Sequence, residues 1–338
     1  MKPINQLRWS KFRNNRRAWY SLWIFSFVFG VSLFSELIAN DKPLIVSYDS
    51  HWYFPFLKNY PETTFGGDFE LEADYRDSYV QTLIAEKGWV LWPLIPFSYR
   101  TINYDLPSPP PSPPSKENWL GTDDKGRDLL ACILYGLRIS VLFGFSITVL
   151  SAVIGVSAGA VQGYYGGRLD LFFQRFIEVW SSMPTLFMLI ILMSVVKPNV
   201  WWLAGFTLLF SWMGFVGVVR AEFLRSRGFE YVLAAKAMGM NDRRLMFKHI
   251  LPNAMIATMT FMPFTLAGSV TILTSLDFLG FGLPPGSPSL GELLAQGKAN
   301  LQAPWLGLAS FSVLAMILTL LVFIGEGVRD AFDPRRSG

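Results

Sequence analysis

The sequence predicts an all-α polytopic membrane protein with six transmembrane helices and a large extracytoplasmic insertion between the first two. Of its 338 residues, 51% are hydrophobic and 16% are charged, which is too apolar for a soluble globular chain. Several runs approach the roughly 20 residues that cross a hydrocarbon core. Lysines and arginines are concentrated in alternate segments between these runs, and this asymmetry sets the orientation of membrane helices.

The six predicted spans are separated by polar segments. They are Trp19–Ala39, Ile139–Val161, Phe176–Val196, Trp201–Val219, Met255–Leu276 and Pro304–Ile324. The third is expected to be interrupted at Ser182, Pro184 and Thr185. Small residues along the second are expected to allow close helix contact: Gly144, Gly155, Ala158, Gly159, Ala160 and Gly163. They divide the chain into a basic start with the first span (1–39), the insertion (40–132), a core with five spans (133–326) and a tail (327–338).

Basic residues predict that both termini lie in the cytoplasm. The start of the chain carries Lys2, Arg8, Lys11, Arg13, Arg16 and Arg17 before any acidic residue. Six spans return the tail, with Arg329, Arg335 and Arg336, to the same side. A cleaved signal peptide is the alternative for the first run, but that run is long and aromatic and no small-residue cleavage site follows it.

The insertion between the first two spans is locally acidic and rich in aromatic residues. Such residues can build a small packed lobe or lie at the membrane interface. Its one histidine, His51, predicts no metal site, and the single cysteine, Cys132, excludes an internal disulfide. A proline run at 107–114 predicts a stiff polyproline II spacer of roughly 25 Å, with a proline-recognition motif as the alternative.

Two turn-rich stretches are candidates for the outer mouth of a transport pathway. The first contains Gly121, Thr122, Asp123, Gly126, Arg127 and Asp128, and the second contains Phe278, Gly280 and Gly282. Irregular backbone so close to a span is tolerated where protein lines a cavity. For the charged residues of the first stretch, a solvated turn is the alternative.

The segment from residue 227 to 253, called the elbow below, is polar, basic and flanked by apolar spans. Good helix formers from Phe229 to Met238 are followed by Gly239, which predicts a left-handed helix end there. Asn241 or Asp242 is expected to cap a second helix that runs through Lys248 and ends at Pro252. A helix–glycine–helix elbow suits docking of a soluble partner; an amphipathic loop on the lipid surface is the alternative.

No catalytic or nucleotide-binding motif is present in the sequence. A phosphate-binding loop of the form G-x-x-x-x-G-K-[ST] is absent, as are a Ser/His/Asp or Cys/His grouping and a zinc signature. The chain is therefore predicted to be neither an enzyme nor the holder of a cofactor or metal. A channel or secondary transporter and a membrane-anchored enzyme are the alternatives, although no clear inverted repeat is found.

Four separated stretches together carry a family resemblance. They are Leu120–Asp128 with Tyr135–Ser140, Gly163–Asp170 (GYYGGRLD), the elbow, and Phe278–Gly282 through Gly291, with Gly325–Arg335 extending the match. The chain resembles the permease subunits of binding-protein-dependent ABC importers of the peptide/opine/nickel group. Within this group it is most similar to the second, C-type permeases of Yej-type oligopeptide importers, which implies a type I importer fold.

The resemblance implies that the elbow corresponds to the EAA loop of this family, which couples the permease to an ATPase. In this chain the coupling loop would comprise residues 220–252. Ala234, Ala235, Gly239, Leu251 and Pro252 are in register with that motif, while Leu233 stands where the family usually has glutamate. Apolar side chains are expected to fill a cleft on the ATPase. Residues expected at this interface also include Glu230, Tyr231, Leu245, Met246, Phe247 and His249.

The same resemblance implies partners, location and cargo. The partners would be a second homologous permease as a heterodimer, two ATPase subunits or one fused ATPase, a periplasmic substrate-binding protein and membrane lipid, but not nucleic acid. ATP and Mg would be used by the ATPases, and the chain would lie in the bacterial inner membrane with the insertion in the periplasm. The cargo would be oligopeptides or peptide-like compounds, including peptide antibiotics; the residues themselves leave nickel, opines and sugar-bearing peptides open.

Overall fold

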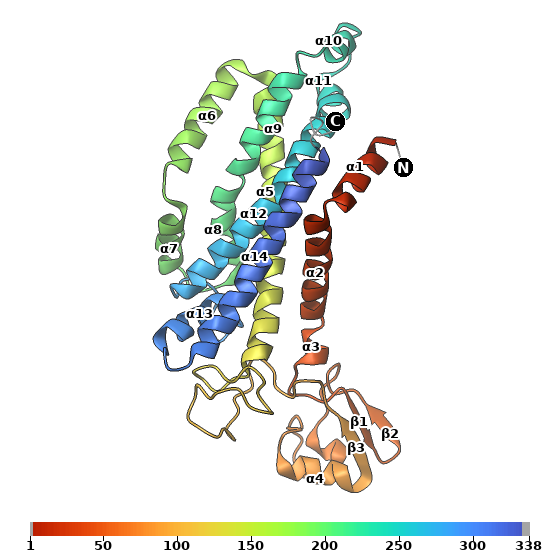
Figure 1. Ribbon diagram of the computed structural model, residues 1–338, viewed down its shortest axis with the longest axis vertical. Helices are drawn as coiled ribbons and strands as arrows, with labels where there is room; N and C mark the ends of the chain where they lie inside the picture. The colour runs from red at the N-terminus through yellow and green to blue at the C-terminus, as the bar shows by residue number, and fades with distance from the viewer. Residues whose placement is uncertain (1–2, 333–338) are drawn as a thin grey trace. The chain divides into compact units, whose positions relative to one another are not determined.

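The computed structural model describes residues 3–332, and Lys2, Arg335 and Arg336 lie outside these described residues. Figure 1 shows the helices and strands of the chain, which forms two compact units. The first unit comprises Met1–Phe27, Ser140–Pro285 and Leu314–Gly338; the second comprises Val28–Ile139 and Gly286–Val313.

Within residues 3–332, four helices are long and apolar enough to cross a membrane, and a bent helix pair would make a fifth. The four are α5 (Leu129–Tyr165), the run Val200–Ser226 formed by α8 (Val200–Ser211) and α9 (Met213–Ser226), the run Asp242–Phe278, and α14 (Pro304–Phe332). They contain the second, fourth, fifth and sixth predicted spans. The chain is thus a helical polytopic membrane protein.

The third predicted span is the bent pair. It consists of α6 (Gly167–Ser181) and α7 (Thr185–Val195), which differ in direction by 74°. Pro184 lies at the break, where it supplies no backbone N–H and disfavours helical conformation in the residue before it. The interruption predicted at Ser182, Pro184 and Thr185 is therefore confirmed.

The first predicted span is shorter than expected. Helix α2 (Arg16–Leu33) ends ahead of a turn at Phe34, and α3 (Ser35–Ile38) follows. The Ser32 hydroxyl donates to the carbonyl of Phe29 at 2.7 Å, and the Ser35 hydroxyl donates to that of Ser32, so side chains compete here for backbone acceptors. Helix α2 begins with two arginines and is not among the four helices that are long and apolar enough to cross a membrane, so the number of six spans stays a prediction.

Small residues on α5 allow close packing within the first unit. A Cβ atom added at Gly155 would lie 2.4 Å from the carbonyl oxygen of Trp212, and one added at Gly163 would lie 2.5 Å from Cβ of Phe223. These glycines and Gly159 follow one another at four-residue spacing and face α9. The close helix contact expected from the small residues of the second span is confirmed.

The second unit contains a lobe with a three-stranded antiparallel sheet in the order β2–β1–β3. Its elements are β1 (Ile45–Tyr48), β2 (His51–Tyr53), the 3₁₀ turn η1 (Glu62–Phe65), α4 (Ser78–Lys87) and β3 (Gly88–Leu91). Its core includes Val46, Phe65, Tyr75 and Ile84. The prediction of a packed aromatic lobe is confirmed, but the sheet shows that the all-α prediction was wrong for this part, where β-branched and aromatic residues favour strands.

The prediction of a stiff polyproline II spacer at residues 107–114 was also wrong. The chain bends at residues 107–111, and Ser112 then pairs with Thr122: its backbone N donates to Thr122 Oγ1 at 2.8 Å, and its carbonyl accepts from Thr122 N at 2.9 Å. These contacts fold the run back onto the chain that follows it. A proline-rich sequence favours polyproline II only where no other contact competes.

Candidate functional site

The first helix of the elbow ends as the sequence predicts. Helix α10 (Glu230–Ala237) stops at Gly239, whose φ is +81°. The N–H of Met240 donates to the carbonyl of Ala235 at 3.2 Å, and that of Gly239 donates to Lys236 at 3.0 Å. This pair of bonds is the Schellman motif, in which a left-handed residue closes a helix. The sharp turn of the elbow therefore depends on glycine at this position.

The second helix of the elbow begins as predicted but does not end as predicted. Asn241 Oδ1 accepts from the N–H of Arg243 at 3.1 Å and caps α11 (Asp242–Leu245). A π-helical turn, η2 (Met246–Ile250), then leads directly into α12 (Leu251–Phe278). In this turn each backbone hydrogen bond spans one residue more than in an α-helix. The rearrangement accommodates Pro252, which has no N–H to donate. Pro252 thus lies inside a continuous helical run of 37 residues, Asp242–Phe278, rather than at its end.

The continuous run Asp242–Phe278 can transmit movement of the elbow into the membrane. The second half of the elbow and a membrane-crossing helix form one run, so a force applied to the elbow acts directly on that span. In Figure 1, α10 and α11 lie at one end of α9 and α12.

The elbow carries a set of exposed apolar side chains, called the exposed apolar face below. Met238 is 79% exposed and Phe247 is 68% exposed, the highest values in the set. Exposed apolar groups of this size on a polar segment mark a surface that binds protein or membrane. The five members are Phe229, Tyr231, Leu233, Met238 and Phe247.

Two predicted anchors are not available to a partner. Leu245 and Met246 are buried in a core with Val219, Phe223 and Ile250, so they hold the elbow on the helices of its own unit. This corrects the expectation that both fill a cleft on an ATPase. A four-residue helix gives too little periodicity to show which of its faces meets the core.

The other predicted elbow residues are divided between surface and core. Ala235 is buried, and half-buried His249 has an Nε2 atom that finds no hydrogen-bond partner within the described part of the chain. Tyr231 accepts through its hydroxyl from Asn253 Nδ2 at 3.3 Å. The exposed members are Glu230, Ala234, Gly239 and Pro252, while Leu251 is half-buried.

A group of polar contacts ties the elbow to α5 and the adjoining helix α9 to α6; we call it the anchor network. It consists of Tyr164, Asp170, Arg220, Arg227 and Asp242. Arg220 binds Asp170 through two bonds, Nε to Oδ1 at 2.5 Å and Nη2 to Oδ2 at 2.6 Å. The hydroxyl of Tyr164 donates to Asp242 Oδ1 at 2.5 Å. Arg–carboxylate pairs with two bonds are directional as well as strong.

Arg227 completes the anchor network at the end of α5. Its Nη1 donates to the carbonyls of Gly163 at 3.4 Å and Tyr164 at 3.2 Å, which are among the terminal carbonyls of that helix. Gly166, with φ of +63°, leaves room for this side chain, since an added Cβ would lie 2.4 Å from Arg227 Nη1. Sequence reasoning missed these pairings; the GYYGGRLD motif, which holds Gly163, Tyr164, Gly166 and Asp170, was the available signal.

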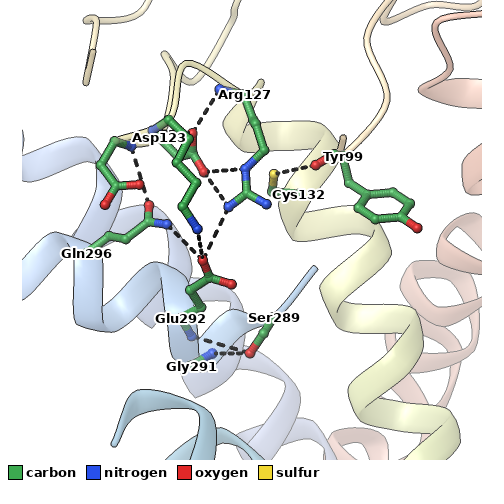
Figure 2. Close-up of polar contacts among 10 residues, drawn as sticks. Tyr99, Asp123, Arg127, Cys132, Ser289, Gly291, Glu292 and Gln296 are labelled. Atoms are coloured by element: carbon green, nitrogen blue, oxygen red, sulfur yellow. Dashed lines mark hydrogen bonds and ion pairs between the residues drawn. The ribbon is translucent and has the colours of Figure 1, made fainter. Parts of the chain in front are cut away.

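The first predicted mouth stretch is a folded ionic cluster of the second unit (Figure 2). The Asp123 side chain is fully buried and accepts from Arg127 Nε at 2.7 Å and from Arg127 N at 2.8 Å. Lys125 Nζ lies 2.7 Å from Glu292 Oε1, and Arg127 Nη2 lies 3.5 Å from the same oxygen. The solvated charged turn, which was the alternative, does not describe this segment.

Glu292 comes from helix α13 (Leu290–Ala299), whose start is capped by Ser289. The Ser289 hydroxyl accepts from the N–H groups of Gly291 at 3.1 Å and Glu292 at 3.3 Å, as Figure 2 shows. This cap positions Glu292 near the two cations. Sequence reasoning did not identify Glu292, because its partners lie more than 160 residues away in the chain.

The remaining residues of the first mouth stretch build its turns. Gly121 and Gly126 have φ of +80° and +78°, which favours glycine at both positions. Asp128 caps α5: Oδ1 accepts from Ala131 N at 2.8 Å, and Oδ2 accepts from Asn118 Nδ2 at 2.8 Å. Burial raises the pKa of the Asp128 carboxyl above its ordinary value.

The second predicted mouth stretch belongs to the first unit. Helix α12 ends at Phe278, and Gly280 has φ of +80°. Asp277 Oδ1 accepts from the N–H of Leu283 at 2.6 Å, and a Cβ added at Gly282 would lie 1.7 Å from that oxygen. The stretch is a tight turn, and a mouth shared with the first stretch stays a prediction.

Two family models match this sequence. Residues 151–338 match the family described as binding-protein-dependent transport system inner membrane component. Residues 5–60 match the N-terminal TM domain of oligopeptide transport permease C. The first match includes the whole elbow and all of the anchor network.

Several curated proteins are similar to this chain over most of its length. An inner membrane ABC transporter permease protein, YejE, of Escherichia coli is 62% identical over 337 residues, which cover 100% of this chain and 99% of the relative. A peptidoglycan transport system permease protein YejE of Agrobacterium fabrum is 52% identical, covering 99% of this chain and 94% of the relative. A dipeptide transport system permease protein DppC of Haemophilus influenzae is 37% identical, covering 64% and 74%.

These relatives are permease subunits, which are transport components rather than enzymes, and they give no support to a secondary transporter or channel. One family model covers more than half of the chain, and one relative is 62% identical over its whole length. The chain therefore belongs to the family of binding-protein-dependent transport system inner membrane components, the permease subunits of ABC importers.

Proposed function

We propose that this chain is a transmembrane permease subunit that imports oligopeptides or peptide-like compounds, with energy from ATP hydrolysis in partner subunits. The main support for the proposal is the structure of the elbow. It presents an exposed apolar face on helices that are continuous with, or anchored to, membrane-crossing helices. Such a surface suits a helix-in-groove contact with a soluble ATPase.

The elbow would transmit the movement of the ATPases in two ways. Residues exposed on α10 and η2, among them Tyr231, Leu233 and Phe247, would bind the ATPase. The run Asp242–Phe278 would carry the displacement into the membrane directly, and the anchor network would carry it to α5 and α6. A rigid-body movement of this kind can alternate the opening of a pathway between the two sides of a membrane.

Six transmembrane helices with both termini in the cytoplasm fit the basic residues of the chain. Helix α2 would be the first of them, and the match of residues 5–60 to an N-terminal TM domain supports this assignment. The domains would then be 1–39, a periplasmic region 40–132, a permease core 133–326 with the coupling loop 220–252, and a cytoplasmic tail 327–338.

The assembly would contain a second, homologous permease, two ATPase subunits or one fused ATPase, and a periplasmic substrate-binding protein in the bacterial inner membrane. ATP and Mg would bind to the ATPases. The two turn-rich stretches, residues 121–128 and 278–282, would border the outer mouth. Peptides are the proposed cargo because several similar permeases are named for dipeptide or oligopeptide transport.

The proposal is tested by affinity capture of the tagged chain from mild detergent, with ATPase activity measured on the eluate. We expect a second permease and ATPase subunits to co-purify, and we expect Gly239→Pro to lose the ATPase subunits because Pro cannot adopt a positive φ. Gly205→Ala is the matched control, since an added Cβ there has no neighbour within 4 Å. A chain that elutes alone and still transports in ATP-free proteoliposomes would contradict the proposal.

A further inference from the structure

The first unit contains a groove between its N-terminal helices and the helices α12 and α14. The groove has a volume of about 560 Å³, within the range of pockets that hold small ligands. Its lining comes from α1 (Pro3–Asn14), α2, α12 and α14. No residue of the elbow's exposed apolar face contributes to it.

The groove is apolar except at one end. Arg8 is the one charged residue of the lining, and its guanidinium lies 4.7 Å from the centre of the Phe332 ring. Within residues 3–332, no carboxylate forms an ion pair with Arg8. The site therefore offers one cation without an anionic partner beside a long apolar surface.

The apolar surface extends away from this cation along two helices. On α14 the lining residues Phe332, Val328 and Ile324 follow one another at four-residue spacing, a length of about 12 Å at 1.5 Å per residue. On α12 the lining runs from Pro252 to Met259. A groove with a cation at one end and about 12 Å of apolar wall matches an amphiphile with an anionic head and a hydrocarbon tail.

Close packing fixes one wall of the groove. Phe12, Ala18 and Ala331 are buried together, and a Cβ added at Gly327 would lie 2.1 Å from Cβ of Ala18. The backbone of α14 at Gly327 thus lies against the Ala18 methyl group of α2. The wall therefore belongs to a packed interface and does not depend on a mobile segment.

Helix α1 is basic, as are segments that lie near an anionic membrane surface. It carries Arg8, Lys11 and Arg13 with no acidic residue, and it exposes Leu7 and Trp9. The first acidic residue of the chain is Glu36, so no acidic side chain within the segment itself offsets its positive charge. Glu326 and Asp330 of α14 line a different pocket, together with Arg16 and Arg17. Segments of this kind attract anionic lipid headgroups.

We propose that the groove binds an anionic phospholipid, with its headgroup phosphate on Arg8 and one acyl chain along Val328, Ile324 and Met259. The bound lipid contacts Pro252 and Met255, which directly follow the π-helical turn of the elbow. It therefore supports the start of α12 at the point where the proposed coupling movement enters the membrane. The binding step itself does not depend on the proposed coupling function.

The test is native mass spectrometry of the detergent-purified complex titrated with phosphatidylglycerol or phosphatidylcholine. Wild type is expected to retain phosphatidylglycerol more tightly than phosphatidylcholine. Arg8→Gln should weaken phosphatidylglycerol binding about fivefold, since one basic residue near a membrane surface contributes about that factor. Met259→Trp, which fills the apolar end of the groove, should weaken binding without a change of charge.

Lys11→Gln is the matched control, because it removes the same charge from the same helix but lies outside the groove. Thermal unfolding of each variant shows whether the fold is kept. Equal binding in Arg8→Gln and Lys11→Gln, no preference between the two lipids, or unchanged binding in Met259→Trp would each overturn the proposal. Displacement by millimolar inorganic phosphate would do the same, since it would show a phosphate site without an acyl-chain contribution.

Failure of these binding tests would leave the capture of ATPase subunits unaffected. The lipid proposal and the proposed function can therefore fail separately.

Discussion

The ion pair between Asp170 and Arg220 provides a sharp test of the anchor network. The carboxylate is 11% exposed and the guanidinium is 29% exposed, so the pair lies between a surface pair and a buried one. Exposed pairs contribute about 0.2–1 kcal/mol, whereas removing one partner of a buried pair costs about 3–5 kcal/mol. With two short bonds, we expect Asp170→Asn and Arg220→Gln each to lower the free energy of unfolding by about 2 kcal/mol.

A double-mutant cycle separates the pair from the rest of its surroundings. Because both variants remove the same interaction, the double variant should cost about as much as either single variant, which corresponds to a coupling energy of about 2 kcal/mol in magnitude. The free energy of unfolding is measured by denaturant titration in detergent micelles. Arg225→Gln is the control: it breaks the exposed i,i+3 pair with Glu222 and should cost less than about 0.5 kcal/mol.

The same variants should separate ATP hydrolysis from transport. In the proposed assembly, the pair joins α9, which leads into the elbow, to α6. Breaking it removes one route by which movement passes from α9 to α6, so ATPase activity should persist while peptide uptake per ATP hydrolysed falls. Additive destabilisation in the cycle, or uptake per ATP equal to that of Arg225→Gln, would refute the reasoning.

Three further predictions concern the elbow and residue Asp128. Gly239→Ala should cost about 1–2 kcal/mol because φ of +81° disfavours a Cβ, and a drop in ATPase co-purification should accompany the lower unfolding temperature. Phe247→Glu should change stability by less than about 0.5 kcal/mol, because the side chain is 68% exposed, yet abolish capture of the ATPase. If capture is kept, Phe247 is not a docking residue. For Asp128, burial raises the folded-state pKa, so its contribution to stability is present below the ordinary value of 3.8 and is lost as pH rises through the raised value. In Asp128→Asn, the free energy of unfolding should therefore fall less as pH rises through that window. Thermal or denaturant unfolding at a series of pH values measures this. An unchanged pH profile would contradict the assignment.

Local signals in the sequence predicted the parts of the fold that depend on local chemistry. The left-handed end at Gly239, the cap at Asn241 and the break at Pro184 each follow from one residue and its immediate neighbours. Long apolar runs likewise identified four spans and the bent pair. These features need no knowledge of which segments pack together.

Features that depend on distant partners could not be predicted in this way. Asp170 and Arg220 are separated by 50 residues, and Arg127 and Glu292 by 165, so neither pairing is visible in a local pattern. The burial of Leu245 follows from contact with α9, which a four-residue helix does not reveal. Pro252 was expected to end the second helix of the elbow. The π-helical turn before it rearranges the backbone hydrogen bonds, and the helix continues through the proline.

The central claim is that the elbow binds an ATPase subunit through its exposed apolar face. The most direct measurement is photo-crosslinking in cells from a benzophenone amino acid placed at Phe247 or Met238, with Leu57 as a control because it is also 74% exposed but lies in the lobe. We expect crosslinks to an ATPase from positions 247 and 238 and none from position 57. Absence of an ATPase crosslink at both elbow positions, or an equal yield from position 57, would contradict it.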